Sequence, residues 1–284
     1  MKRINVLLSL VLAAAVGLFG VYLLWIHNNL DTTGPVITID EELLVISVED
    51  PEEALFQGIT AVDDRSGDVT GSLLVESIYG INEDNLTNVV YAAFDHAGNV
   101  SKIARQICYD DYRHPRFELF GSLTFPADSG YDVLDFVGAS DVIEGDIRRR
   151  VHATLVSDTK SLNEVGTHKV RFQVTNSLGD TVELDLPVEV YDPQWYSARV
   201  ELEEYLIYIK QGSSFRAEDY LKTFLLRGDE IDLSYRIPED VVCEINGTVN
   251  TQVPGVYDID FILSKNVNLE TFSGQAKLIV VVEE

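Results

Sequence analysis

Two stretches of the chain recur with the same spacing and decide the fold class: AVDDRSGDV at residues 61–69 and VYAAFDHAGN at residues 90–99. Their counterparts downstream are ASDVIEGDI at 139–147 and RFQVTNSLGD at 171–180. In both copies the first alanine precedes the first glycine by six positions. A third copy keeps only its later half, PGVYDIDF at 254–261. Repetition at a fixed interval indicates a tandem array of one structural unit.

Short runs rich in Val, Ile, Tyr, Phe and Thr surround these stretches and stop at Gly, Asp, Asn or Pro. Beyond residue 34 the period of an amphipathic helix is almost absent, whereas many short strands with regular turn signals are typical of β-sandwiches. We therefore predict an all-β fold, with three tandem immunoglobulin-like β-sandwich domains after one N-terminal transmembrane helix. The predicted strand runs are residues 35–39, 43–48, 88–94, 169–175, 182–190, 256–263 and 276–282.

The repeat and the junctions between its copies set the expected domain boundaries. Residues 1–30 are expected to hold a cytoplasmic tip, the transmembrane helix and a short linker. The three sandwich domains are expected at residues 31–111, 112–191 and 192–284, the last of which is divergent.

The sequence TAVDDRSGDVT (60–70), together with YAAFDHAGN (91–99), resembles bacterial immunoglobulin-like repeats of the type known from pesticidal crystal proteins and bacterial surface proteins. Such repeats carry an A-T-D-x-x-x-G-D-(I/V)-T loop and a Y-x-A-x-D-x-x-G-N hairpin. The second copy keeps this spacing with Asn176 and Asp180 in place of the hairpin Asp and Asn. The third is similar to a variant with G-x-x-F-x-x-x-D-Y, here GSSFRAEDY at 212–220, and lacks the acidic loop. The resemblance covers about residues 34–284 and implies a surface-exposed, non-enzymatic module without specifying a ligand.

The motif residues also have a structural interpretation. Gly98 can adopt a positive φ, and the Asp95 carboxylate can accept hydrogen bonds from turn amides. Gly67-Asp68 and Gly145-Asp146 are likewise typical of turns.

Acidic residues gather where the first two domains are expected to meet. The loop after the second strand and the last hairpin of such a sandwich lie at the end where the chain enters. Ca²⁺ takes six to eight oxygen ligands, which several loops together can supply. The alternative, that these are solvated turn carboxylates, stays open because no contiguous EF-hand loop is present. The candidate metal ligands are Asp110, Asp111, Asp141, Glu144, Asp146 and Asp180, and no other cofactor is expected.

The N-terminus predicts a membrane anchor. Lys2 and Arg3 precede an uncharged stretch, residues 4–26, and the next basic residue is Arg65. About 20 apolar residues cross a bilayer core, and basic residues favour the cytoplasmic side. We therefore expect a single-pass signal-anchor with the N-terminus in the cytoplasm and the domains outside the cell membrane. Cleavage as a signal peptide near residues 13–15 is the alternative.

Charge and motifs limit the function. Asp and Glu number 47 against 21 Lys and Arg, a net charge of −26, so a phosphate-rich nucleic acid would be repelled and a monomer is favoured. No H-E-x-x-H, G-x-S-x-G or G-x-G-x-x-G motif occurs, so no enzyme activity is expected. We expect a membrane-anchored, non-catalytic cell-surface binding, adhesion or stalk module with a protein or glycan ligand. The alternative is an accessory subunit of a membrane or cell-envelope assembly, recruited through the transmembrane helix or the third domain.

Overall fold

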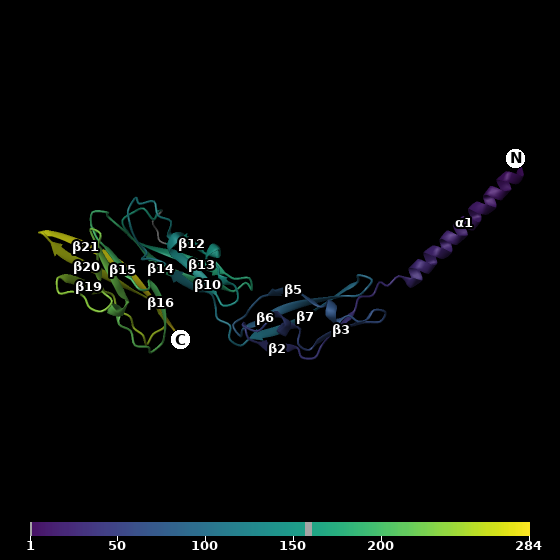
Figure 1. Ribbon diagram of the computed structural model, residues 1–284, viewed down its shortest axis with the longest axis horizontal. Coiled ribbons are helices and arrows are strands. Elements are labelled where there is room, and N and C mark those ends of the chain that lie inside the picture. Colours follow the sequence, from purple (N-terminus) through teal and green to yellow (C-terminus); the bar gives the residue numbers. More distant parts are fainter. Residues whose placement is uncertain (1, 157–160) are drawn as a thin grey trace. The chain divides into compact units, whose positions relative to one another are not determined.

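The computed structural model describes residues 2–156 and 161–284 of the chain (Figure 1). Helix α1 (Lys2–Asn29) precedes a succession of strands and short 3₁₀ turns. The chain separates into two compact units, residues 1–110 and 111–284. The first unit holds one β-sandwich and the second holds two.

The sandwich of the first unit consists of a three-stranded and a four-stranded sheet. Strands in the first sheet follow the order β1-β3-β4, and those in the second follow β2-β7-β6-β5. Only the β2–β7 pair is parallel among the described pairs of this domain. The strands are β1 (Val36–Ile39), β2 (Leu43–Ile46), β3 (Ile59–Asp63), β4 (Gly67–Asp68), β5 (Leu74–Tyr79), β6 (Leu86–Phe94) and β7 (Val100–Tyr109), with 3₁₀ turns η1 (Glu52–Phe56) and η2 (Thr70–Ser72).

The second domain repeats this arrangement strand for strand. Its sheets follow the orders β11-β10-β8 and β12-β13-β14-β9, and β9 lies parallel to β14. The strands are β8 (Arg116–Leu119), β9 (Thr124–Pro126), β10 (Val137–Asp141), β11 (Gly145–Asp146), β12 (His152–Leu155), β13 (Gly166–Thr175) and β14 (Thr181–Tyr191), with turns η3 (Val133–Phe136) and η4 (Arg148–Arg150).

The third domain has the same pattern, with sheet orders β15-β17-β18 and β16-β21-β20-β19. Here a hairpin between β17 and β18 replaces the acidic loop of the other two domains. The strands are β15 (Arg199–Leu202), β16 (Leu206–Lys210), β17 (Leu221–Leu226), β18 (Asp229–Asp232), β19 (Val241–Asn246), β20 (Gly255–Val267) and β21 (Glu270–Glu283), with turn η5 (Ala217–Tyr220). The predicted all-β fold of repeated sandwich units is confirmed, and every predicted strand run overlaps an observed strand.

Alternating burial explains why these runs form sandwich strands. Along β13, every second side chain from His168 to Val174 is buried, as expected when one face of a strand covers a core. The aromatic residue at one repeated position is fully buried in every domain: Tyr91, Phe172 and Phe261 are each 0% exposed. The Tyr91 hydroxyl also donates to Leu55 O at 2.6 Å, so its one polar atom is satisfied.

The second and third domains share a core. Leu206 of β16 and Ile279 of β21 belong to the buried cluster of the second domain, with Tyr208 and Val281 packed against it. In Figure 1 the strands of these two domains lie side by side, and β16 contacts β8 while β21 contacts β9. The Tyr208 hydroxyl accepts a hydrogen bond from the Phe117 amide at 3.0 Å. The two domains therefore form one unit stabilised by buried apolar surface.

The predicted turns are confirmed at residue level. Gly98, Gly67 and Gly145 have φ values of 88°, 75° and 73°, in the left-handed region that glycine adopts at little cost. Asp95 Oδ1 accepts a hydrogen bond from the Asn99 amide at 2.7 Å, as expected for a turn aspartate.

The predicted membrane anchor is not supported. Among the residues that the structure describes, no helix combines the length and the apolar character that a bilayer crossing requires. This finding corrects the transmembrane interpretation of residues 4–26 and the predicted localisation in the cell membrane. The side chains of Lys2 and Arg3, on which the expected orientation depended, lie outside the described part of the chain.

Candidate functional site

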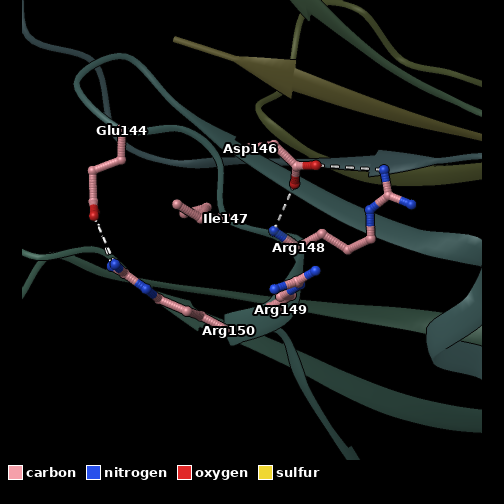
Figure 2. Close-up of a pocket in the computed structure, with 6 residues that line it drawn as sticks. All are labelled: Glu144, Asp146, Ile147, Arg148, Arg149 and Arg150. Atoms are coloured by element: carbon pink, nitrogen blue, oxygen red, sulfur yellow. Dashed lines mark hydrogen bonds and ion pairs between the residues drawn. The ribbon is translucent and has the colours of Figure 1, made fainter.

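A surface pocket of about 580 Å³ lies in the second domain, around turn η4. Figure 2 shows its lining residues, which come from the loop between β10 and β11, from β11, and from the turn with the residue before it. The loop begins at Asp141, whose Oδ1 accepts the amides of Ile143 and Glu144 at 2.9 and 3.0 Å. The lining residues are Glu144, Asp146, Ile147, Arg148, Arg149 and Arg150.

Two of the three arginines are held in place by neighbours. Arg150 makes two parallel hydrogen bonds to the Glu144 carboxylate at 2.7 and 2.8 Å, a geometry that fixes the guanidinium plane. Arg148 lies with its guanidinium 4.6 Å from the ring centre of Phe120 and 3.5 Å from Asp146 Oδ2. Burial raises the pKa of Glu144, but the hydrogen bonds from Arg150 and the Ser177 amide outweigh it and leave this pKa below its usual value. Glu144 is therefore ionised and its pair with Arg150 is charged.

Arg149 differs from its neighbours. Its side chain is exposed. Within residues 2–156 and 161–284, its guanidinium makes no ion pair or hydrogen bond, and no dashed line reaches it in Figure 2. In a chain with a net charge of −26, an exposed cation between two positioned arginines forms a local basic site. A guanidinium binds carboxylate, sulfate or phosphate groups with paired hydrogen bonds.

The first domain shows that the turn does not require arginine. Its counterpart η2 has the sequence Thr70-Gly71-Ser72. The residues before the two turns have nearly the same backbone angles, −116° and 20° at Val69 against −113° and 20° at Ile147. Each also donates its amide to the equivalent carbonyl, Ala61 O or Ala139 O. The backbone of η4 therefore does not depend on its arginines.

Three aspartates converge in the first unit. Asp31 lies in the linker before β1, Asp63 ends β3, and Asp95 follows β6. One carboxylate oxygen from each lies within 4.8 Å of the other two. Asp63 and Asp95 are buried, with 5% and 7% of their surface exposed. This is the one group of three or more metal-ligating side chains found within residues 2–156 and 161–284.

Hydrogen bonds keep two of these carboxylates ionised. The Ser66 amide, which donates to Asp63 Oδ1 at 2.6 Å, is the largest influence that holds the pKa of Asp63 below its usual value. Burial raises the pKa of Asp95, but hydrogen bonds from the Asn99 side chain and amide outweigh it and lower this pKa overall. The group is therefore a concentration of negative charge. A basic group lies beside it: Arg65 Nε is 3.9 Å from Asp31 Oδ2.

The second domain fills the equivalent place with hydrogen-bond donors. Asn176 occupies the position of Asp95, and Tyr112 precedes the first strand as Asp31 does in the first domain. Asn176 Nδ2 donates to Asp141 Oδ2 at 2.9 Å and to the Tyr112 hydroxyl at 2.8 Å. The Tyr112 hydroxyl in turn donates to Asp180 Oδ2 at 2.6 Å. The carboxylates of Asp141 and Asp180 are thereby connected through the neutral side chains of Asn176 and Tyr112. The first domain has a third carboxylate in this place.

The six residues predicted as Ca²⁺ ligands are distributed over both compact units. Asp141 and Asp180 belong to the network just described, whereas Glu144 and Asp146 pair with arginines of η4. Asp110 ends the first compact unit and Asp111 begins the second. The metal site at the junction stays a prediction.

Sequence reasoning missed the aspartates of the first unit and the arginines of η4. Asp63 and Asp95 were visible in the repeated motifs, where Asp95 was interpreted as a turn residue. Asp31 gave no signal, because it lies in a polar linker outside either motif. The basic site could have been found by aligning the two copies, since RRR at 148–150 stands opposite TGS at 70–72.

Comparisons with known proteins identify no family. No family model matches the chain, and no curated protein matches it. Among solved structures, it is similar to the CBM51-2 in complex with GlcNAc and INT domains from Clostridium perfringens ZmpB, with 17% identity and a TM-score of 0.23 over 55% of this chain and 26% of that one. The Protocadherin GammaB4 extracellular domain matches with 13% identity and a TM-score of 0.20 over 88% of this chain and 49% of that one. Mouse Cadherin-23 EC22-24 matches with 12% identity and a TM-score of 0.20 over 89% and 99%.

These likenesses concern β-sandwich arrays and are weak. The chain spans about a quarter of the first of these structures and about half of the second. With TM-scores of 0.20 to 0.23, none of them carries an argument about ligand or activity. What this chain binds must be argued from its own residues.

Proposed function

We propose that the chain is a non-catalytic binding or adhesion module built from immunoglobulin-like domains, and that its second domain binds an acidic ligand at the turn Arg148–Arg150. The observation that carries the proposal is the contrast between the two copies of this turn. The first copy folds with Thr70-Gly71-Ser72, so three consecutive arginines are not a structural requirement.

The geometry favours a ligand with carboxylate or sulfate groups on a glycan or protein. Arg148 and Arg150 are positioned by Phe120 and Glu144, which reduces the side-chain entropy lost on binding. Arg149 supplies an exposed guanidinium between them.

The proposal assigns no catalytic residue. Both carboxylates that line the pocket, Glu144 and Asp146, are paired with arginine. A general acid and base require carboxyl groups in environments that separate their pKa values.

Binding of two acidic probes by the full chain tests the proposal. Heparin serves as a sulfated glycan and polyglutamate as an acidic polypeptide, each measured by calorimetry at low and at physiological salt. We expect one of them to bind, more weakly as salt screens the charges. Arg149→Ser should reduce that affinity by about tenfold, the value of one charge-assisted contact of roughly 1.4 kcal/mol.

A matched control separates the turn from general charge. Arg236 of the third domain is also highly exposed, at 73% of its side chain, and Arg236→Ser makes the same change in net charge. This variant should bind as the original chain does. Equal loss in both variants, or failure of both probes to bind at low salt, would contradict the proposal.

A second candidate function, accessory subunit of an assembly recruited through the third domain, is favoured by its exposed apolar side chains. Tyr235 is 95% exposed, and Leu269 is fully exposed at a hairpin tip. Trp195 is 54% exposed. Aromatic anchors of this kind dominate protein interfaces. If this candidate holds, a Tyr235→Ser, Leu269→Gly double variant will lose a partner that co-purifies with the original chain, while Arg149→Ser will retain it.

A further inference from the structure

We infer that Asp31, Asp63 and Asp95 form a Ca²⁺ site in the first unit, in a place separate from the predicted junction site. The inference does not depend on the proposed ligand of the second domain, because the residues, the domain and the ligand class are different.

The first supporting observation is the convergence of charge. Three carboxylates from three separate segments present oxygens within 4.8 Å of one another, and two of these side chains are more than nine-tenths buried. Buried like charges repel strongly unless a counter-charge lies among them. Arg65 Nε lies 3.9 Å from Oδ2 of Asp31, and the Arg65 side chain is 48% exposed, so water screens its charge.

The second, independent observation is one oxygen atom. Asp63 Oδ2 is buried and accepts no hydrogen bond from the described residues, although Oδ1 of the same carboxylate accepts two. Almost all buried polar atoms have a partner, so such an atom requires an explanation.

The second domain shows which partner is missing. There the equivalent oxygen, Asp141 Oδ2, accepts a hydrogen bond from Asn176 Nδ2 at 2.9 Å. In the first domain Asp95 stands where Asn176 stands and has no hydrogen to donate when ionised. In the first domain, a cation between Asp63 and Asp95 would supply the partner for Asp63 Oδ2 that the Asn176 amide supplies for Asp141 Oδ2 in the second domain.

The oxygen-only ligand set selects the type of ion. His and Cys, the ligands that favour zinc and copper, are absent from the group. Ca²⁺ accepts six to eight oxygens in flexible geometry, whereas Mg²⁺ requires a near-ideal octahedron. Three carboxylates can supply three to six of these oxygens, and water can supply the rest. An ion here would also fasten the linker at Asp31 to the ends of β3 and β6.

Calcium binding by the full chain, first stripped with chelator, tests the inference. Titration with CaCl₂ in a calorimeter should show one site, with a Kd of about 10⁻⁴ to 10⁻³ M as in other weak structural modules. MgCl₂ should bind at least about tenfold more weakly. Asp95→Asn, which reproduces the residue of the second domain, should abolish binding.

Two further variants keep the test decisive. Asp141→Asn removes the equivalent carboxylate from the second domain and should leave Ca²⁺ affinity unchanged. Arg65→Gln removes the nearby positive charge without removing a ligand and should tighten binding about threefold to tenfold. Circular dichroism of each variant checks that it is folded. Absence of Ca²⁺ binding by the original chain up to 10 mM, or unchanged binding by folded Asp95→Asn, would overturn the inference.

Discussion

The hydroxyl of Tyr112 lies 2.6 Å from Asp180 Oδ2 and donates to it while accepting a hydrogen bond from Asn176 Nδ2. Burial is the largest cause that raises the pKa of this phenol, and the hydrogen bond to Asp180 adds to it. The hydroxyl therefore stays protonated and joins the segment before β8 to the hairpin after β13. The neutral hydroxyl of Tyr112 thus bridges two segments of the second domain, as we propose that Ca²⁺ does in the first domain.

Replacement of Tyr112 by Phe should destabilise the second unit. The change removes a hydrogen bond to a charged group and leaves the Asn176 amide with one partner fewer, at a cost of about 1–3 kcal/mol. Urea denaturation followed by tryptophan fluorescence measures it, because Trp195 lies in this unit. Asp180 is then left with His114, which contacts it at 2.8 Å. An unchanged midpoint in the Tyr112→Phe variant would show that the bridge adds no stability.

Lys277 should be among the most sensitive positions in the chain. Its side chain is 3% exposed, and its Nζ lies 2.5 Å from Asp260 Oδ1 and 3.2 Å from Asp258 Oδ2. Lys277→Met leaves these carboxylates, whose side chains are 26% and 50% exposed, without their counter-charge, and losing hydrogen bonds between charged groups costs about 1.5–3 kcal/mol. The control is Lys265→Met, since water screens the pair of Lys265 with the exposed Asp240, which should therefore contribute little to stability. Similar losses in both variants would contradict the idea that burial of the Lys277 ammonium strengthens its ion pairs.

Leu269 should be replaceable with a gain in stability. It occupies the two-residue loop between β20 and β21 with a φ of 71°, next to Asn268 at 51°, as in a type I′ turn. The equivalent loop between β17 and β18 has Gly228 at this position, with a φ of 91°. Leu269→Gly should therefore stabilise the unit by about 1 kcal/mol.

The reverse substitution in the other hairpin is the control. A Cβ at Gly228 would have open space around it, with no atom within 4 Å apart from its chain neighbours, so Gly228→Leu should destabilise by a similar amount through backbone strain. Thermal denaturation of both variants measures the two effects. A loss of stability in Leu269→Gly would mean that the exposed leucine makes a stabilising contact.

Alkaline pH should weaken the second unit through Tyr208. Burial is the largest cause that raises the pKa of Tyr208, to about 12, against 10.0 for an exposed phenol. Between these pH values the unfolded chain loses the proton and the folded one keeps it, so the free energy of unfolding falls as pH rises from 10 to 12. Across this pH range the free energy of unfolding should fall by about 3 kcal/mol in total.

The Tyr208→Phe variant isolates this contribution. It lacks the hydrogen bonds with Phe117 and starts less stable at pH 8, but it should lose less stability between pH 10 and pH 12. Urea titrations at pH 8, 10 and 11.5 give the slopes. Parallel slopes for the two proteins would place the alkaline sensitivity in other tyrosines.

The fold was predictable because its information is local and repeated. The turn glycines Gly67 and Gly145 recur with the same spacing, and strand runs with alternating polarity flank them. The shared core was not predictable, because Leu206 and Ile279 are ordinary strand residues whose partner surface depends on how two domains pack. Packing between domains leaves no periodic signal in a single sequence.

The sites were only partly predictable for a related reason. Carboxylates at the ends of strands were recognised as potential metal ligands, but the group was expected at the junction with the second domain. The deciding differences are the exchange of Asp95 for Asn176 and the approach of Asp31 from a linker that no motif marks. Residues 4–26 were interpreted as a membrane anchor from their hydropathy and from the basic residues before them, which the structure does not support.

The core shared by the second and third domains limits where recombination can divide the gene without harming the folded product. Recombination that separates the two would leave Leu206 and Ile279 without their burial and would open the apolar interior of the second domain to water. A gene fragment that ends near residue 191 would therefore encode an aggregation-prone product, whereas a crossover between residues 110 and 111 cuts where the compact units divide. We therefore expect recombination to copy, lose or transplant residues 111–284, the pair of sandwiches, as one piece.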